Sequence, residues 1–440
     1  MSVPVAPGRL PLLGHTLSLL RARSRFTAGL RDLGEIVEVR LGPVPAYFVT
    51  SPRLVHQVLV TDGSRFRKGI MFERFRPFLG NGLVLSEGGF HRRQRRMVQP
   101  AFHHERIARY AATMVRAADD LTSTWRPGEV RVVEHDMQAL AVTIVGEALF
   151  STELGQPVIA EIRRSVFDVT KNGMVRALSP GFVARLPLPV NRRFDRATER
   201  MRGIVLDVIA SRRSAGVDHG DLLSMLLVAQ DEESGDGMTD QQVYDEVLTL
   251  LTAGIETTAL ALAWVFHEIA ANPEVERRVH AEVDEVLSGR PVVFEDLPKL
   301  VYLHHVVNEV LRKYPIWILM RKAVEPVDLG GTRLPAGAEV IISPHGVHHD
   351  PAHYPDPERF DPDRWTPDRA ARLPKGAFVP FGGGARQCVG NVFAQTEAVL
   401  TLATVAARWR LVPVPGKPVR TKFTTAAYPT DLLMTPVPRD

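Results

Sequence analysis

The chain has 440 residues, of which 45% are hydrophobic and 24% charged, and its formal net charge is +4 at neutral pH. These values are typical of a globular protein with a large buried core, and so small a positive excess does not by itself indicate nucleic-acid binding. The single cysteine excludes an internal disulfide, so the fold does not need an oxidising compartment.

The N-terminal segment does not have the features of a targeting or membrane segment. Residues 1–21 lack a charged region followed by an apolar stretch and a small-residue cleavage site, so no signal peptide is predicted. Proline and glycine interrupt the same residues and rule out a spanning helix there. We therefore expect a cytoplasmic protein without a membrane anchor.

Strands are expected in the N-terminal part, roughly residues 30–60, and helices in the remainder. The stretch 35–50, EIVEVRLGPVPAYFVT, is rich in β-branched and aromatic residues around a Gly-Pro turn, which predicts a hairpin. From about residue 102 onward, apolar residues recur with helical periodicity. A cationic cluster, HRRQRR at 91–96, is either a solvated helix face or a docking patch for an anionic partner.

A long helix is predicted over 240–272. Thr239 and Gln242 form a capping box at its start, and Pro273 ends it. Its middle is apolar for long enough to cross a membrane, but Glu256 and several threonines lie within it, and a carboxylate is costly inside a bilayer. We therefore expect the buried central helix of a globular core.

Three histidines, His345, His348 and His349, have a spacing that could seat zinc. No cysteine or fourth ligand is near them in the sequence, so a surface role or a role within the loop is predicted instead.

Cys388 lies in the glycine-rich stretch FGGGARQCVG, just before a predicted helix. The free N–H groups and the dipole at a helix N-terminus favour a thiolate over a thiol, and the glycines let a flat ligand approach the backbone. Arg386 can neutralise a carboxylate on that ligand. A thiolate against a flat, carboxylate-bearing ligand is the arrangement of an axially ligated haem.

The same stretch matches the pattern F-x-x-G-x-R-x-C-x-G and therefore resembles the cytochrome P450 family. A chance match or an inert buried cysteine is the alternative. The resemblance extends from the N-terminal PGRLPLLGH to the C-terminal TTAAYP. It implies one mainly α domain over 1–440 with a small β region, in place of the two or three domains that the length suggests, with haem between the long central helix and the cysteine loop.

Within the long helix, AGIET at 253–257 resembles the family motif A-G-x-[D/E]-T for oxygen activation. Gly254 is expected to leave room for a diatomic ligand. Glu256 and Thr257 supply a carboxyl and a hydroxyl that can pass on protons, and they are the predicted catalytic residues. The alternative is a threonine bonded back to a carbonyl of its own helix and a glutamate in an ion pair at the edge of the core.

Further motifs imply a structural triad and a set of haem-binding residues. Glu309 and Arg312 fit E-x-x-R, and the third member is assigned to Arg364 rather than Arg359, because F-x-P-x-R-W aligns with residues 360–365. The resemblance implies that the haem is of b type, an iron protoporphyrin IX ligated by Cys388 and not covalently attached. The implied partners of its propionates are His91, Arg95, Arg321 and Arg386.

The resemblance implies a monooxygenase that inserts one oxygen atom of O₂ into a C–H bond. No flavin or iron–sulfur region is present in the sequence, so electrons are expected from a separate ferredoxin and an NAD(P)H-dependent ferredoxin reductase. The remaining arginines of 91–96 would suit this acidic partner, and a monomer is expected. Three rivals are a peroxygenase using H₂O₂, a non-catalytic haem sensor, and a cysteine hydrolase with a histidine partner.

The segments that line the substrate pocket in the family are apolar and aromatic here, which favours a compact hydrocarbon, although ordinary core packing would look the same. The chain resembles actinobacterial members that oxidise cyclic sesquiterpenes, and a pentalenene-like substrate of secondary metabolism is predicted. A polyketide, a steroid or a fatty acid is the alternative. The predicted pocket residues are Phe72, Phe75, Phe78, Leu250, Ala253, Ile316, Trp317, Ile318, Thr425 and Ala426.

Overall fold

The computed structural model of the chain describes residues 3–21, 23–150, 156–178, 183, 186–215, 219–315, 318–423 and 426–439. Its residues divide into two compact units. The sheet unit comprises Met1–Arg74, Asn308–Cys388 and Thr425–Ala427. The helix unit comprises Phe75–Val307, Val389–Thr424 and Tyr428–Asp440.

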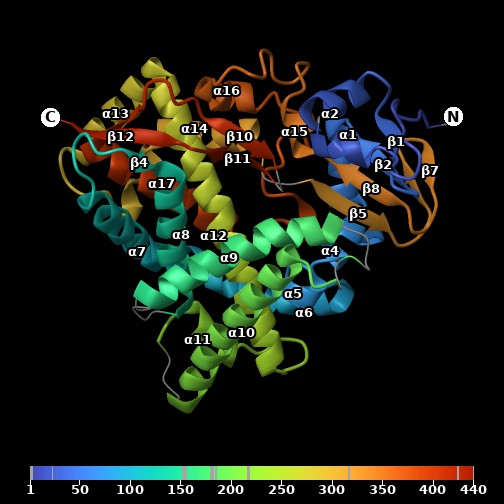
Figure 1. Cartoon of the computed structure of the whole chain (residues 1–440), viewed down its shortest axis with the longest axis horizontal. Coiled ribbons are helices and arrows are strands. Elements are labelled where there is room, and N and C mark those ends of the chain that lie inside the picture. The colour runs from blue at the N-terminus through green and yellow to red at the C-terminus, as the bar shows by residue number, and fades with distance from the viewer. Residues whose placement is uncertain are drawn as a thin grey trace. The chain divides into compact units, whose positions relative to one another are not determined.

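The sheet unit is built on five strands in the order β1-β2-β8-β5-β3 (Figure 1). The predicted hairpin is confirmed: β1 and β2 pair antiparallel from Ile36–Val49 to Leu41–Val44, and Gly42 turns with a φ of 63°. β8 then runs parallel to β2. The elements of this unit are α1 (Thr16–Arg21), α2 (Arg23–Arg31), β1 (Ile36–Leu41), β2 (Val44–Val49), α3 (Pro52–His56), η1 (Gln57–Thr61), η2 (Gly63–Arg65), β3 (Phe66–Lys68), α4 (Ile70–Glu73), β5 (Leu319–Ala323), β6 (Val327–Leu329), β7 (Thr332–Leu334), β8 (Glu339–Ile342), α15 (Pro344–His348), η6 (Pro362–Trp365), α16 (Pro367–Ala370) and η7 (Gly384–Arg386).

The helix unit is organised around α12, which contacts α8, α10, α13 and α17. Its elements are α5 (Arg76–Leu79), α6 (Gly88–Val98), η3 (Gln99–Phe102), α7 (His104–Ser123), β4 (Arg131–Val132), α8 (Val133–Phe150), α9 (Gln156–Leu178), α10 (Pro189–Ala215), α11 (Leu222–Val228), α12 (Asp240–Ala271), α13 (Pro273–Leu287), η5 (Phe294–Lys299), α17 (Asn391–Arg408), β9 (Trp409–Pro413), β10 (Arg420–Phe423) and β12 (Leu433–Pro438). Two more, α14 (Val301–Lys313) and β11 (Ala427–Thr430), have residues in both units.

The long helix and its start are confirmed. The Thr239 hydroxyl accepts from the Gln242 N–H, and the Gln242 side chain accepts from the Thr239 N–H, which completes the capping box. Among the described residues α12 is the one helix long and apolar enough to span a membrane, but 67% of its most apolar stretch is buried inside the protein. This burial is what the central helix of a core shows.

Strands are more widely distributed than the sequence predicted. β5 to β8 occupy 319–342 and β9 to β12 occupy 409–438, well outside the expected region of 30–60. The predicted helix after the cysteine is confirmed as α17, with Gly390 as its N-cap.

Candidate functional site

The cysteine loop is ordered by its own backbone. The Cys388 N–H donates to the Phe381 carbonyl at 2.9 Å, and the Gln387 N–H donates to the Gly384 carbonyl at 3.0 Å. Cys388 itself is an exposed residue of this ordered loop.

Gly384 cannot carry a side chain in this loop. Its φ is 64°, and a Cβ atom added there would lie 2.2 Å from the Leu59 carbonyl oxygen of η1. The loop thus packs directly on the backbone of η1, which is possible only for glycine. This contact fixes the loop against the sheet unit.

The Glu309 carboxylate is the centre of a fully buried network. It accepts from Arg312 Nε and Nη2 at 2.9 Å each, from Arg364 Nε at 3.3 Å and from Trp365 Nε1 at 3.1 Å. The Asp361 N–H adds a bond at 3.0 Å. The structure therefore places Arg364 against Glu309, at the position that the sequence motif assigns to it.

The two arginines of this network also hold backbone that leads to the cysteine loop. Arg312 donates to the carbonyls of His348 at 3.0 Å and Pro357 at 2.8 Å. Arg364 donates to the Asp356 carbonyl at 2.8 Å. In turn, His348 Nε2 accepts from the Val379 N–H at 2.9 Å. The histidine is fully buried, so of the two predicted alternatives, a surface role and a role within the loop, the structure shows the second for His348.

One face of α12 is open in the middle of the helix. Ala253 is exposed, and Leu250, Glu256 and Thr257 are partly exposed. On the other faces Leu251, Ile255 and Thr258 are 0%, 3% and 4% exposed. Positions 250, 253 and 257 share one side of a helix, so Ala253 and Thr257 of the predicted oxygen-activation motif lie along a face that a ligand can reach.

The structure changes the expected roles of Gly254 and Thr257. A Cβ on Gly254 would lie 3.1 Å from Val145 of α8, so this glycine lets two helices pack closely and does not leave room for a ligand. The Thr257 hydroxyl donates to the Ala253 carbonyl at 2.6 Å, which is the helix-internal alternative. With its proton donated to this carbonyl, the Thr257 oxygen is able to accept a hydrogen bond from a molecule on the open face.

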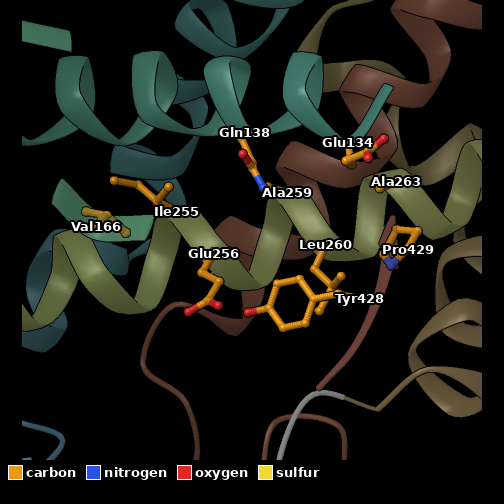
Figure 2. Close-up of a pocket in the computed structure, with 10 residues that line it drawn as sticks. All are labelled: Glu134, Gln138, Val166, Ile255, Glu256, Ala259, Leu260, Ala263, Tyr428 and Pro429. Atoms are coloured by element: carbon orange, nitrogen blue, oxygen red, sulfur yellow. The ribbon is translucent and has the colours of Figure 1, made fainter. Parts of the chain in front are cut away.

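A cavity of about 40 Å³ adjoins Glu256 (Figure 2). Glu134 and Gln138 reach it from α8, and Tyr428 reaches it from β11 with its hydroxyl directed toward the Glu256 carboxylate (Figure 2). Glu134 is held by the N–H groups of residues 431 and 432, at 2.9 and 3.1 Å. The cavity has space for ordered water between polar groups. Sequence reasoning missed Glu134 and Gln138, because nothing local connects them to a motif more than a hundred residues away.

The four predicted haem-binding residues lie in two pairs. In the helix unit, His91 is buried and Arg95 half-buried, one turn apart on α6. In the sheet unit, Arg321 is 5% exposed on β5 and donates to the Met320 carbonyl at 3.0 Å. Arg386 is half-buried at the end of η7.

The other arginines of the 91–96 cluster are not all available to an acidic partner. Arg96 donates to Asp231 at 2.7 and 2.9 Å and pairs with Glu233 at 2.9 Å. Arg93 donates to the carbonyls of residues 236 and 237, at 3.4 and 3.1 Å. The expectation that these two suit a redox partner is therefore corrected, since the loop before α12 occupies them. Arg92 is exposed.

The predicted pocket residues fall on several elements. Phe78 is 4% exposed and meets Phe194 of α10 edge-on at 5.7 Å. Phe75 lies 3.4 Å from the position of a Cβ on Gly173 of α9. In the sheet unit Phe72 and Ala426 are buried and Ile318 is half-buried. Ile316, Trp317 and Thr425 lie outside the described residues.

Two adjacent acids on α12 hold the segment that follows Phe78. Asp245 accepts from the Asn81 N–H at 2.8 Å, and Glu246 accepts from the Leu83 N–H at 2.9 Å. Burial raises the pKa of Glu246 to about 8. Sequence reasoning missed both, although two acids inside an apolar helix signal that buried partners must exist.

The comparisons with known proteins agree with this geometry. A family model described as cytochrome P450 matches residues 4–440. The chain is 47% identical over 413 residues to the cyclooctat-9-en-7-ol 5-monooxygenase of Streptomyces melanosporofaciens, covering 93% of this chain and 90% of that protein. It is 45% identical over 438 residues to the cyclooctatin synthase of the same organism, covering 99% and 95%.

A third relative, the pentalenene oxygenase of Streptomyces avermitilis, is 37% identical over 425 residues, covering 96% of this chain and 94% of that protein. Among solved structures, the haem domain of cytochrome P450DA superposes with a TM-score of 0.88 at 25% identity, over 100% of this chain and 98% of the other. Since the family model covers nearly the whole chain, the protein belongs to the cytochrome P450 family.

Proposed function

We propose that this monooxygenase inserts one oxygen atom of O₂ into a C–H bond of a cyclic terpenoid in secondary metabolism. The substrate class is supported by the relatives, whose names refer to cyclooctat-9-en-7-ol, cyclooctatin and pentalenene. The apolar, open face of α12 at Leu250 and Ala253 is compatible with such a molecule. Phe75 and Phe78 of the helix unit are also proposed as pocket residues, and Ile318 of the sheet unit stays a prediction from the sequence.

The single observation that carries the proposal is the exposure of the only cysteine, at the end of a loop fastened through Gly384. This loop fits a haem b, for which Cys388 would be the axial ligand. Bound haem would supply the one-electron and O₂ chemistry that amino-acid side chains lack. His91, Arg95, Arg321 and Arg386 would neutralise its propionates, and the triad of Glu309, Arg312 and Arg364 would hold the loop in place.

Glu256 and Thr257 have distinct proposed roles. Glu256 is partly exposed between the open face of α12 and the cavity next to Tyr428, so its carboxyl can take a proton from water in the cavity and deliver it at the open face. Thr257 would hold a water molecule or another hydrogen-bond donor in place at the open face by accepting its hydrogen bond at Oγ1. Its own hydroxyl donates to the Ala253 carbonyl.

Electrons are proposed to come from a ferredoxin and its NAD(P)H-dependent reductase in the cytoplasm. The exposed Arg92 is available to an acidic partner, whereas Arg93 and Arg96 are engaged within the chain. We further propose that residues 1–440 act as one catalytic domain and that the enzyme is a monomer.

Replacing Cys388 by serine tests the axial ligand. We expect the reduced, CO-bound wild type to absorb at about 450 nm, as thiolate ligation requires, and the variant to lose this band. The control is Gln387→Ser, which changes the neighbouring exposed side chain and should keep the band. A Cys388→Ser protein that retains it would rule out thiolate ligation at this position.

Replacing Thr257 by alanine tests the proton delivery. The band at about 450 nm should remain, while product formed per NAD(P)H consumed falls on the order of tenfold and H₂O₂ accounts for the difference. The matched control is Thr258→Ala, one position along but 4% exposed on a closed face. Full coupling in Thr257→Ala would contradict the role of this hydroxyl, and loss of coupling in both variants would assign the effect to packing.

A further inference from the structure

The N-terminal part of the sheet unit exposes a concentration of apolar side chains. Of fifteen large apolar side chains exposed in the described part of the chain, five lie between residues 5 and 33. Scattered exposed leucines are ordinary, whereas grouped ones mark an interaction site. These five are Val5 (54% exposed), Leu10 (40%), Leu12 (93%), Leu13 (52%) and Leu33 (40%).

Three of them form one short loop, Leu10–Leu13, called the leucine loop below. Its ends are joined by two backbone hydrogen bonds of 2.9 Å between Leu10 and Gly14. A Cβ on Gly14 would lie 2.3 Å from the Arg40 carbonyl oxygen, and the His15 N–H donates to that oxygen at 2.7 Å. The leucine loop is therefore fastened at its base to β1.

The residue at the tip of this loop, Leu12, has a strained backbone, and its large apolar side chain is not used in the core. Leu12 has a φ of 60°, a left-handed conformation that costs energy for any residue with a branched side chain and is tolerated by glycine and asparagine. At 93% exposure the side chain gains almost nothing from the core. A strained, solvent-exposed leucine points to a contact made outside the folded chain.

The charge of the N-terminal residues 1–31 indicates the kind of surface that Leu12 contacts. The first 31 residues contain five arginines and no aspartate or glutamate, whereas the whole chain has a net charge of only +4. Two of the acids that follow are neutralised within the fold: Glu35 pairs with Arg53 at 2.7 Å and Glu38 with Arg40 at 2.9 Å. Arg31 is itself paired with Asp350 at 2.9 Å, but the segment still carries four further arginines and no acid in its sequence. Exposed apolar side chains in a segment of this charge match the interface of a bilayer with anionic headgroups. The five arginines are Arg9, Arg21, Arg23, Arg25 and Arg31.

We propose that the leucine loop inserts into the interfacial region of an anionic lipid bilayer and docks the enzyme reversibly on its surface. A few leucines and a small net charge provide much weaker attachment than a spanning helix, so the protein exchanges between membrane and solution. The proposal concerns the sheet unit alone and does not depend on the substrate.

The test is co-sedimentation of the holoenzyme with vesicles of phosphatidylcholine, with and without phosphatidylglycerol. Binding is expected to the anionic vesicles only, and it should weaken as salt is raised. Leu12→Asn should lower the partition coefficient about tenfold, the loss expected when one large apolar contact is removed. Since asparagine tolerates the left-handed conformation, its urea midpoint should equal or exceed that of the wild type.

The matched control is Val228→Ser, which removes another exposed apolar side chain, 70% exposed at the end of α11, and should bind like the wild type. Three results would overturn the proposal: no sedimentation with anionic vesicles, equal sedimentation with neutral ones, or an unchanged partition in Leu12→Asn. A concentration-dependent dimer that Leu12→Asn abolishes, without vesicle binding, would assign the loop to a second copy of the chain.

Discussion

Replacing Glu309 by glutamine is expected to lower the free energy of unfolding by about 3–5 kcal/mol, the cost of leaving buried charges without their partner. Glu309 and Arg312 are 0% exposed and Arg364 is 5% exposed. In the variant, the amide NH₂ group would replace one of the two carboxylate oxygens of Glu309. It would then face the N–H donors from which that oxygen accepts hydrogen bonds in the wild type. Two guanidinium groups would remain in the core without a counter-charge.

The consequence should reach the cysteine loop. Arg312 and Arg364 hold carbonyls of residues 348, 356 and 357, and His348 holds the backbone of Val379, which comes shortly before the loop. Loosening this backbone should therefore reduce haem retention as well as stability. Urea unfolding followed by circular dichroism measures the first effect, and the haem-to-protein ratio measures the second.

The chain contains its own control for this experiment. Glu274 and Arg277 have the same i, i+3 spacing on α13 and pair at 2.6 Å, but their side chains are 67% and 68% exposed. Glu274→Gln should leave the urea midpoint unchanged, because solvent screens an exposed pair. Similar midpoints for Glu309→Gln and Glu274→Gln would show that the buried network does not support the fold.

Acid should destabilise the protein through His348. Burial, with a further contribution from the charge of Arg312, lowers the pKa of His348 from 6.5 to about 3. Its Nε2 accepts from the Val379 N–H at 2.9 Å. Protonation would turn Nε2 into a donor that faces the donor N–H of Val379, and this hydrogen bond would be lost. Between pH 6.5 and 3 the unfolded chain binds a proton here that the folded chain does not. The contribution of neutral His348 to the free energy of unfolding is therefore fully present above pH 6.5. It is lost as the pH falls, by about 1.4 kcal/mol per pH unit.

Comparing the wild type with a His348 variant isolates the effect of this residue on the pH dependence of stability. Glu246 changes the stability in the opposite direction, because its raised pKa of about 8 leaves the folded state with the extra proton above pH 4.5. We expect His348→Gln, whose amide oxygen can still accept from Val379, to reduce the slope of unfolding free energy against pH between 6.5 and 5 by about 1.4 kcal/mol per unit. His353→Gln, in the partly exposed loop nearby, is the control. Parallel pH profiles for wild type and His348→Gln would contradict the buried neutral state.

Local signals in the sequence were sufficient for the elements that carry the chemistry. The boundaries of α12 follow from a capping box and a proline, each of which acts within four residues. The glycine pattern before Cys388 anticipated a loop with left-handed positions, such as Gly384 at 64°. The spacing around residues 360–365 also selected Arg364 over Arg359, and the structure places its Nε 3.3 Å from Glu309. The first two signals act within a few residues of the feature that they predict, whereas the contact between Arg364 and Glu309, 55 positions apart, followed from the resemblance to the family motif.

The orientation of these elements required the tertiary structure. Because α12 is apolar on nearly all sides, its periodicity could not reveal that Ala253 and Thr257 face open space while Gly254 packs on Val145. Nor could it show that Tyr428 and Gln138 meet Glu256 at one cavity. The partners of Arg93 and Arg96, and the complete burial of His348, likewise depend on residues far away in the chain. Burial and charge pairing arise from contacts between distant segments, and a linear pattern does not contain them.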